Sequence, residues 1–486
     1  MKNSLKIRSQ DLAMAFVDDL RGLKYVFFSG GGWYSYSNKN GWKLIPDWSV
    51  KAQVNRFCLN RIQSNENLSK QRLNDVMEFV KTFLTVPELA DDTSDPARWL
   101  QFDNNGLVIR SESAAGWIAC SNFLLDVEKV ASALYNKTPI PEEAVKPLSP
   151  ELFVLGRVPC DFEPGSACPR WVQFVKEVLP DKTERNNLQR LFGLSLTFNR
   201  KYNVFFVVYG VAGTGKSTCL AVLEKLNSGT ICAVSLSDFG KPFAIFPLTE
   251  NRLNLVADVP AVWESASTAF DREAVLKSLT DGEIYSVERK FQDIDKRRLV
   301  ALSVFGSNQV PRFADKSGAI RQRLRLLPFP VQFRGKPGQD SNLKEKLLSE
   351  LPGVFIWSLT GYGELLSEGY KTFPESEKAE ILKHEAELKS NPVLQFCEEY
   401  LEHAKSDSVV SSENVYRAYQ SFCNKNGLRA SSSNIVIPEI VQIMGIKKPV
   451  PYGKSRRKAF LGIRLAIDSE EADSGDSCSN VQEVKG

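Results

Sequence analysis

Apolar residues recur along the middle of the chain in patterns that predict both strands and helices. The run 204–209 is β-branched and aromatic, which predicts a buried strand. Residues 218–229 then carry leucine and valine at helical spacing and end at a glycine, which predicts a helix. Two further apolar runs, 252–258 and 297–308, predict strands that each end in polar residues. The first strand, the loop after it and the helix thus stand in the order that a phosphate-binding loop needs.

The loop between the first strand and its helix is the strongest chemical signal. It fits the pattern G-x-x-x-x-G-K-[ST], in which glycines let the backbone approach phosphate oxygens, and N–H groups at the helix start form an anion site. We therefore expect ATP to bind here, with Lys216 at the β- and γ-phosphates and the Ser217 hydroxyl on Mg²⁺. The expected nucleotide-binding residues are Gly210, Val211, Ala212, Gly213, Thr214, Gly215, Lys216, Ser217 and Thr218.

Polar residues at the ends of the next two strands are candidates to complete the site. Asp258 is the candidate acid that holds Mg²⁺ and polarises water (the Walker B acid), although an aspartate is also common where a strand turns into a loop. Glu264 is a weaker candidate for a second acid. Asn308 follows the strand expected beside the glycine-rich loop, where it could sense the γ-phosphate or orient the attacking water. By itself, Asn308 would be interpreted as a turn residue.

A basic run closes this part of the chain. Residues 321–325 read Arg-Gln-Arg-Leu-Arg and precede Leu-Pro-Phe. Arg321 and Arg323 could belong to a solvated face. They could also reach the γ-phosphate bound to a neighbouring subunit, as an arginine finger that neutralises charge in the transition state. Composition does not decide between these interpretations.

Taken in order and spacing, the motifs resemble those of the superfamily-three helicases. The resemblance is closer to the C-terminal helicase part of the phage, plasmid and poxvirus primase-helicases, and it covers roughly residues 100–465. Residues 121–126 (SNFLLD) sit where the family often has a strand that ends in aspartate. The motifs that carry the resemblance read YGVAGTGKST, LNLVADVP, LKSLTDGEIYSVERKFQD, FGSNQVPRFAD and IRQRLRLLPF.

The resemblance implies an α/β fold with an AAA+-like P-loop NTPase core. It also implies that the chain assembles as a homo-oligomer, a hexamer with ATP between its subunits. It implies that IRQRLRLLPF is the strand of the arginine finger. The sequence departs from the family pattern at three places. Asp258 replaces a usual glutamate, Gln322 interrupts an arginine pair, and residues 281–283 read Asp-Gly-Glu rather than Gly-Gly-Asp. The implied roles are Lys216 and Ser217 for ATP and Mg²⁺, Asp258 as Walker B acid, Asn308 as sensor, Arg323 as finger with Arg321 in reserve, and Arg289 and Lys290 on a DNA-gripping hairpin.

Both ends of the chain predict separate structures. Residues 24–45 alternate aromatics around Asn40-Gly41 and predict a β-hairpin, with the triple glycine 30–32 as a structural turn. Near the other end, helices precede a basic segment around Pro-Tyr-Gly, an order that resembles a winged helix with a basic wing. Its expected phosphate contacts are Lys454, Arg456, Arg457 and Lys458, although such charges can also be merely solvated.

Composition excludes several classes of protein. Apolar residues make up 43% and charged residues 25%, which argues against bulk disorder, and the net charge of +4 is only mildly basic. Nine cysteines, without a C-x2-C pair, indicate reduced core thiols rather than a disulfide framework or a zinc ribbon. No apolar run approaches ~18 residues and the N-terminus is not a secretory signal, so we expect no membrane partner and a cytoplasmic location in the host cell.

Scarce histidine also limits the chemistry. The two histidines are His384 and His403, so catalysis earlier in the chain must use lysine, arginine and carboxylates, and we expect no primase activity. The expected organisation is an N-terminal α+β region (1–100), a helicase-associated region (101–198), the ATPase core (199–345), a helical linker (346–390), a C-terminal winged-helix domain (391–467) and an acidic tail (468–486). We expect the tail to be disordered and to solvate the end of the chain, with mimicry of nucleic acid as the alternative.

The leading hypothesis is an ATP-dependent, ring-forming DNA helicase that replicates a phage, plasmid or other mobile element. It would bind single- and double-stranded DNA and work with a separate primase or other replication proteins. One alternative is an origin-binding initiator or switch ATPase without processive unwinding. A P-loop ATPase or kinase unrelated to DNA is a further alternative, against which the basic segments argue.

Overall fold

The computed structural model divides into two compact units, residues 1–383 and 384–486, which are described separately. No helix within the described ranges is both long and apolar enough to cross a bilayer. The eight cysteines that lie in those ranges are free thiols. The structure describes residues 7–20, 24–28, 32–39, 41–62, 68–86, 97–103, 107–114, 116–198, 201–241, 243–259, 266–288, 294–311, 313, 318–333, 340, 342–369, 373–406, 408–452 and 457–466.

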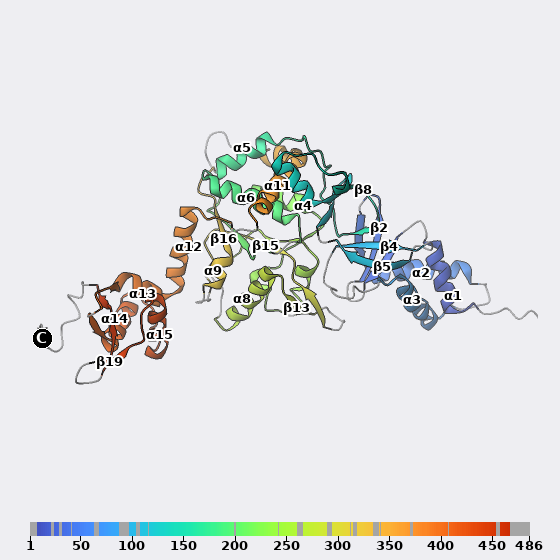
Figure 1. The fold of residues 1–486 in the computed structure, drawn as a ribbon. Coiled ribbons are helices and arrows are strands. Elements are labelled where there is room, and N and C mark those ends of the chain that lie inside the picture. Colours follow the sequence, from blue (N-terminus) through green and yellow to red (C-terminus); the bar gives the residue numbers. More distant parts are fainter. Residues whose placement is uncertain are drawn as a thin grey trace, which may run out of the picture. The chain divides into compact units, whose positions relative to one another are not determined.

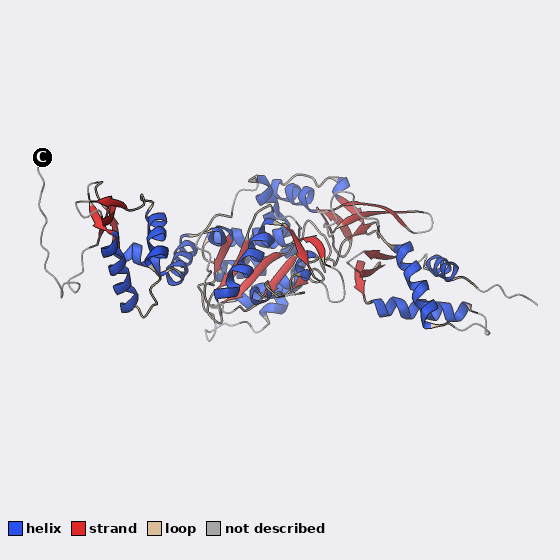
Figure 2. Ribbon diagram, turned by 90° about the horizontal axis from the view of Figure 1, so that it is seen from below, coloured by secondary structure: helices blue, strands red, loops and turns tan. Residues whose placement is uncertain are grey.

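A parallel five-stranded sheet forms the centre of the first unit (Figures 1 and 2). The apolar runs of the sequence become its inner strands, and every pairing between neighbours is parallel. β15 lies between β10 and β12, so the strand before Asp258 is not a direct neighbour of the strand before the glycine-rich loop. The strand order is β11 (Ile231–Cys232), β12 (Leu253–Val256), β15 (Leu302–Ser307), β10 (Phe205–Tyr209) and β16 (Leu324–Pro328).

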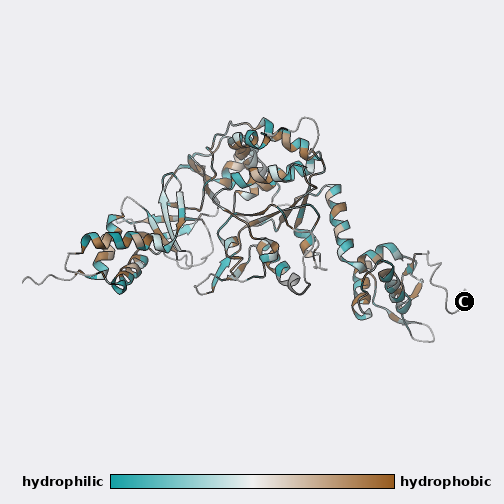
Figure 3. Cartoon of the chain, turned by 180° about the vertical axis from the view of Figure 1, so that it is seen from behind, coloured by the Kyte–Doolittle hydropathy of each residue, from teal (hydrophilic) through white to brown (hydrophobic). Residues whose placement is uncertain are grey.

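Helices cover both faces of this sheet. Alternate residues of β10 point to opposite sides, so Phe206 and Val208 join one hydrophobic core while Phe205 and Val207 join another. In Figure 1 the two sets of helices lie on either side of the sheet, and in Figure 3 their ribbons carry both apolar and polar residues. The first core holds α4 (Val127–Asn136), α5 (Pro169–Val178), α6 (Lys182–Ser195), α7 (Lys216–Leu226), α10 (Leu343–Ser349) and α11 (Leu351–Ser367), and the second holds α8 (Ala266–Asp281) and α9 (Ala319–Arg323).

Helix α11 corrects the expected linker 346–390. It packs against α4 and α6 and buries most of its length in the first core. A Cβ added at Gly363 would lie 2.2 Å from the carbonyl oxygen of Ala131 in α4, so the helices approach closely there. Buried Arg190 of α6 pairs with Glu364 and Glu368 of α11 at 3.1 and 2.6 Å. Only α12 (Glu377–Ser390) fits the expected polar helix.

A β-hairpin interrupts the predicted strand 297–308. Arg297 and Arg298 belong to β14 (Asp295–Arg298), which pairs antiparallel with β13 (Ile284–Val287), and the sheet strand starts only at Leu302. The hairpin stands where the motif resemblance implied one. In the sequence, Arg289 and Lys290 come between its two strands. Both lie outside the described residues, as does Glu264.

The N-terminal part of the first unit contains helices and small antiparallel sheets. The hairpin expected at 24–45 is a three-stranded sheet in which Ser37 pairs with Gly41; Gly30, Gly31 and Asn40 lie outside the described residues. Its elements are α1 (Ser9–Asp19), β1 (Tyr25–Phe28), β2 (Gly32–Ser37), β3 (Gly41–Ile45), α2 (Asp47–Arg61), α3 (Lys70–Leu84), β4 (Arg98–Phe102), β5 (Val108–Ser113), β6 (Trp117–Ala119), β7 (Phe123–Asp126), β8 (Val145–Pro147) and β9 (Leu152–Phe153). Strand β7 matches the expected strand that ends in aspartate.

The second unit combines helices with short strands around its own core. Its aromatic centre contains Phe396, Tyr419, Phe422 and Phe460. The expected basic hairpin is present as β19 and β20, but Lys454, Arg456 and the tail 468–486 lie outside the described residues. The elements are α13 (Pro392–Tyr400), β17 (Leu401–His403), β18 (Val409–Ser411), α14 (Ser412–Lys425), α15 (Ser433–Met444), β19 (Val450–Tyr452), β20 (Arg457–Leu461) and β21 (Ile463–Leu465).

Candidate functional site

The glycine-rich loop leads from the end of β10 into α7. Gly213 and Gly215 have φ angles of 82° and 91°, a left-handed region that favours glycine. A Cβ added at Gly215 would also lie 2.8 Å from a methyl group of Val178. Both the backbone conformation and the lack of space therefore disfavour a side chain at this position. Ser217 is exposed in the first turn of α7. The loop thus presents backbone N–H groups and a hydroxyl at a helix start, as an anion site requires.

The segment after β16 holds the glycine-rich loop in place through two hydrogen bonds, and the sequence did not predict this contact. After β16, the Phe333 N–H donates to the Gly213 carbonyl at 2.8 Å, and the Gln332 side-chain amide donates to the Ala212 carbonyl at 3.3 Å. The available signal was the Leu-Pro-Phe sequence at the end of β16, because parallel strands bring the segments that follow them to one edge of the sheet.

Lys216 lies at the centre of the site. Its ammonium donates to the carbonyls of Gly210 and Val211 and, at 2.8 Å, to the side-chain oxygen of Asn308. Burial lowers the pKa of Lys216 below its ordinary value, while the negative charge of Asp258 acts in the opposite direction. The structure therefore brings Lys216, Asn308 and Asp258 into one electrostatic environment.

Asp258 follows β12 after one intervening residue and has an exposed side chain. The next residue, Val259, donates its N–H to the Gly306 carbonyl of β15 at 2.9 Å, which ties this turn to the strand that precedes Asn308. The exposed oxygens of Asp258 and Ser217 are the kind of ligand that Mg²⁺ prefers. No cluster of three or more histidine, cysteine or acidic side chains forms a metal site within the described ranges.

The two candidate finger arginines lie in a helix rather than in a strand. Arg323 is the last residue of α9, and its guanidinium makes three hydrogen bonds of 2.7 to 3.2 Å with the Asp281 carboxylate. Arg321 pairs with Glu380 at 3.2 Å. The resemblance implied that these two arginines belong to the strand itself, which was wrong, because β16 begins one residue later, at Leu324.

Strand register separates Arg323 from the glycine-rich loop of its own chain. Leu324 pairs with Phe205 at the start of β10, whereas the loop begins after Tyr209, at the other end of that strand. Four residues of strand span about 13 Å. Arg323 and the loop therefore lie at opposite edges of the sheet.

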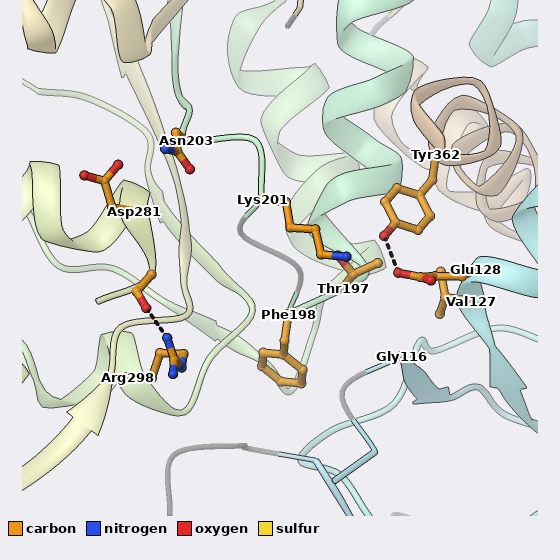
Figure 4. A pocket seen from close by; sticks show the side chains of 11 residues that line it. Gly116, Val127, Glu128, Thr197, Phe198, Lys201, Asn203, Asp281, Arg298 and Tyr362 are labelled. Carbon is orange, nitrogen blue, oxygen red and sulfur yellow. Dashed lines mark hydrogen bonds between the residues drawn. The ribbon is translucent and has the colours of Figure 1, made fainter. Parts of the chain in front are cut away.

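A cavity of about 460 Å³ lies at the edge of the sheet that carries Arg323 (Figure 4). Its lining combines aromatic and charged side chains, including Phe198, Lys201 and Asp281. The Arg298 guanidinium donates to the Gly282 carbonyl at 2.7 Å on one side of it. Neither the cavity nor its lining was predicted from the sequence.

In the second unit, the described cations of the hairpin are exposed. Arg457 and Lys458 begin β20, and Arg457 lies 3.5 Å from Glu413 of α14. The Ser412 hydroxyl donates to the Lys458 carbonyl at 3.0 Å, so the strand is fixed to the start of α14. A groove of about 610 Å³ between α14, α15 and this hairpin includes Lys448 and Lys458 in its lining.

Two family models match parts of the chain. Residues 208–323 match a family of unknown function, DUF5906, and residues 388–459 match the family described as Poxvirus D5 protein-like. The protein named "Putative helicase L207/L206" of Acanthamoeba polyphaga mimivirus is 18% identical over 414 residues, which is 77% of this chain. The resemblance to the primase-helicase family is thereby confirmed. The chain spans 39% of the length of the mimivirus relative.

Solved structures share the fold of this chain. Two apo structures of the NrS-1 C-terminal region superpose with TM-scores of 0.51 and 0.53 at 10% identity. The superpositions include 94% and 95% of this chain and all of each NrS-1 chain. The chain thus has a mixed α/β fold with a parallel sheet like that of the NrS-1 region.

Proposed function

We propose that this chain is an ATP-dependent DNA helicase that works as a ring in the replication of a phage, plasmid or other mobile element. The observation that carries the proposal is the separation of Lys216 from Arg323. Lys216 contacts Asn308 at one edge of the sheet, and Arg323 lies at the other. A complete site for phosphoryl transfer would then need Arg323 from a second copy, as in a ring with ATP between subunits.

In this proposal the glycine-rich loop is a P-loop. Lys216 contacts the β- and γ-phosphates, and Asn308, already bonded to the same ammonium, orients the attacking water or senses the γ-phosphate. Ser217 and Asp258 would hold Mg²⁺, which would neutralise charge on the phosphates. The Asp258 carboxylate is also the candidate that polarises water.

DNA contacts would come from two hairpins. Arg289 and Lys290 come between β13 and β14 in the sequence, and the β19–β20 hairpin presents Arg457 and Lys458 as the wing of a winged-helix domain. Cations at hairpins contact phosphates without reading sequence, which suits a motor that moves along DNA. The mimivirus relative, named as a helicase, supports the same activity.

The alternative is an origin-binding switch ATPase that remodels DNA without processive unwinding. The observation that favours it is the second unit, a compact body with a basic hairpin that could hold the chain at one DNA site. Only strand displacement distinguishes it from a helicase.

The test is ATP hydrolysis with and without single-stranded DNA, followed by strand displacement on a forked duplex. We expect DNA to stimulate turnover, and Lys216→Ala to abolish it. Lys225→Ala is the matched control, because Lys225 is exposed at the far end of the same helix. Stimulated turnover without strand displacement would support the switch, and turnover that Lys216→Ala leaves intact would overturn both proposals.

A further inference from the structure

The Asp281 carboxylate holds the guanidinium of Arg323 through three hydrogen bonds, although the two residues are 42 apart in the sequence. Arg323 Nη2 donates to Oδ1 and Oδ2 of Asp281 at 2.9 and 2.7 Å, and its Nε donates to Oδ1 at 3.2 Å. The side chains are 19% and 25% exposed, so water competes only partly with the pair. Multiple bonds to one carboxylate select a single orientation of the planar guanidinium.

Asp281 is also the residue from which the β13–β14 hairpin departs. It ends α8, and Gly282 turns the chain with a φ of 64°, a left-handed conformation. The Arg298 guanidinium at the end of β14 donates to the Gly282 carbonyl at 2.7 Å. Both strands of the hairpin are therefore tied to the turn next to Asp281.

Space beside this turn permits it to shift. Asp281, Gly282 and Arg298 all line the cavity of about 460 Å³, and Figure 4 shows the bond from Arg298 to the backbone at its wall. Closely packed interiors resist such shifts, whereas a turn that borders a cavity can move with fewer lost contacts. A displacement of the hairpin would thus act directly on Asp281.

We propose that Asp281 is a positioning residue that couples the β13–β14 hairpin to Arg323. DNA bound at the hairpin shifts the Asp281–Gly282 turn, and the carboxylate then reorients the guanidinium toward the phosphates of the neighbouring subunit. The inference deepens the proposed function and rests on it, because it assigns the regulation of that ATPase site to one carboxylate.

The test compares Asp281→Asn with the wild type in three measurements: turnover without DNA, turnover with saturating single-stranded DNA, and affinity for that DNA. The amide keeps the shape but loses the charge that holds the guanidinium. We expect the ratio of stimulated to basal turnover to fall about tenfold or more toward one, with DNA affinity within about twofold of wild type. Asp281→Glu keeps the charge and should restore most of the ratio.

Asp295→Asn is the matched control. Asp295 belongs to the same hairpin and pairs with Arg297 at 2.7 Å, so this variant removes one hairpin carboxylate without touching Arg323. An Asp281→Asn protein that behaves like Asp295→Asn, or that loses stimulation only because it loses DNA affinity, would overturn the inference.

A second variant keeps the inference testable if Asp281→Asn does not fold, as judged by thermal melting. Arg298→Gln removes the guanidinium that ties β14 to the Gly282 carbonyl, and it should also lower the stimulation ratio without weakening DNA binding. Full stimulation in Arg298→Gln would then overturn the coupling. Two other results would contradict the proposed function rather than the role of Asp281. One is a wild-type protein whose turnover DNA does not stimulate, and the other is a Lys216→Ala protein that still hydrolyses ATP.

Discussion

The ammonium of Lys216 donates a hydrogen bond of 2.8 Å to the side-chain oxygen of Asn308, which lies 92 residues later in the chain. The contact exists because β10 and β15 are parallel neighbours, so the segments that follow them meet at one edge of the sheet. It links the residue expected to bind phosphate with the residue expected to sense it.

Replacing Asn308 should separate binding from catalysis. Asn308→Ala removes the amide that we propose orients water but leaves the loop intact, so turnover should fall about 100-fold while ATP affinity changes little. Gln309→Ala is the control, because this neighbouring side chain is exposed and its residue is held through the backbone N–H. Equal losses in the two variants would contradict a role for Asn308.

The lowered pKa of Lys216 predicts a pH-dependent stability. Burial lowers this pKa below 10.5, so between the two values the unfolded chain keeps a proton that the folded chain releases. Stability from this group therefore rises with pH across that interval. Methionine carries no charge that burial would penalise, so Lys216→Met should melt at a higher temperature than wild type near neutral pH. This difference in melting temperature should shrink as the pH is raised into the alkaline range. A difference that is constant with pH, as expected for Lys225→Met, would contradict the prediction.

Arg323 should act across a subunit interface. Lys216→Ala and Arg323→Ala should each be inactive, but an equal mixture should recover activity at about a quarter of its interfaces if subunits assort randomly. Those interfaces combine an intact Lys216 with an intact Arg323 from the neighbour. Mixing Lys216→Ala with a double variant of both residues is the control and should recover nothing. The absence of recovery in the first mixture would indicate that Arg323 does not act in trans.

The wing cations should determine the salt dependence of DNA binding. Arg457→Ala combined with Lys458→Ala should reduce the slope of log affinity against log salt by about two, because each cation displaces counterions from phosphates. The matched control removes two exposed cations, one at the other end of α14 and one in the segment after it, with Lys425→Ala and Arg429→Ala. An unchanged slope in the wing variant would indicate that its charges are merely solvated. Adding Arg456→Ala extends the test to a residue outside the described structure.

Gly363→Ala should destabilise the first unit. Alanine favours a helix interior over glycine by about 1 kcal/mol, but the added Cβ would meet the Ala131 carbonyl oxygen at 2.2 Å. Overpacking of this kind costs about 1–3 kcal/mol, so the clash should prevail and lower the melting temperature of this large unit by about one to three degrees. Gly165→Ala is the control, since no atom lies within 4 Å of its added Cβ. A more stable Gly363→Ala protein would contradict the close packing of α11 on α4.

Local patterns in the sequence determined much of this protein. The strand at 205–209, the glycine-rich loop, the helix after it and the basic hairpin at 450–461 all follow from residue periodicity and turn residues. These signals suffice because each lies within about twenty consecutive residues. The assignment of catalytic and DNA-binding roles to those segments stays a prediction.

Only the tertiary structure decided which distant segments meet. It placed β15 between β10 and β12, joined Asp281 to Arg323, and put α11 in the core rather than in a linker. Periodicity reports which face of an element is buried but not what buries it. Strand order and long-range ion pairs depend on how elements pack in space, and a pattern of neighbouring residues does not contain that information.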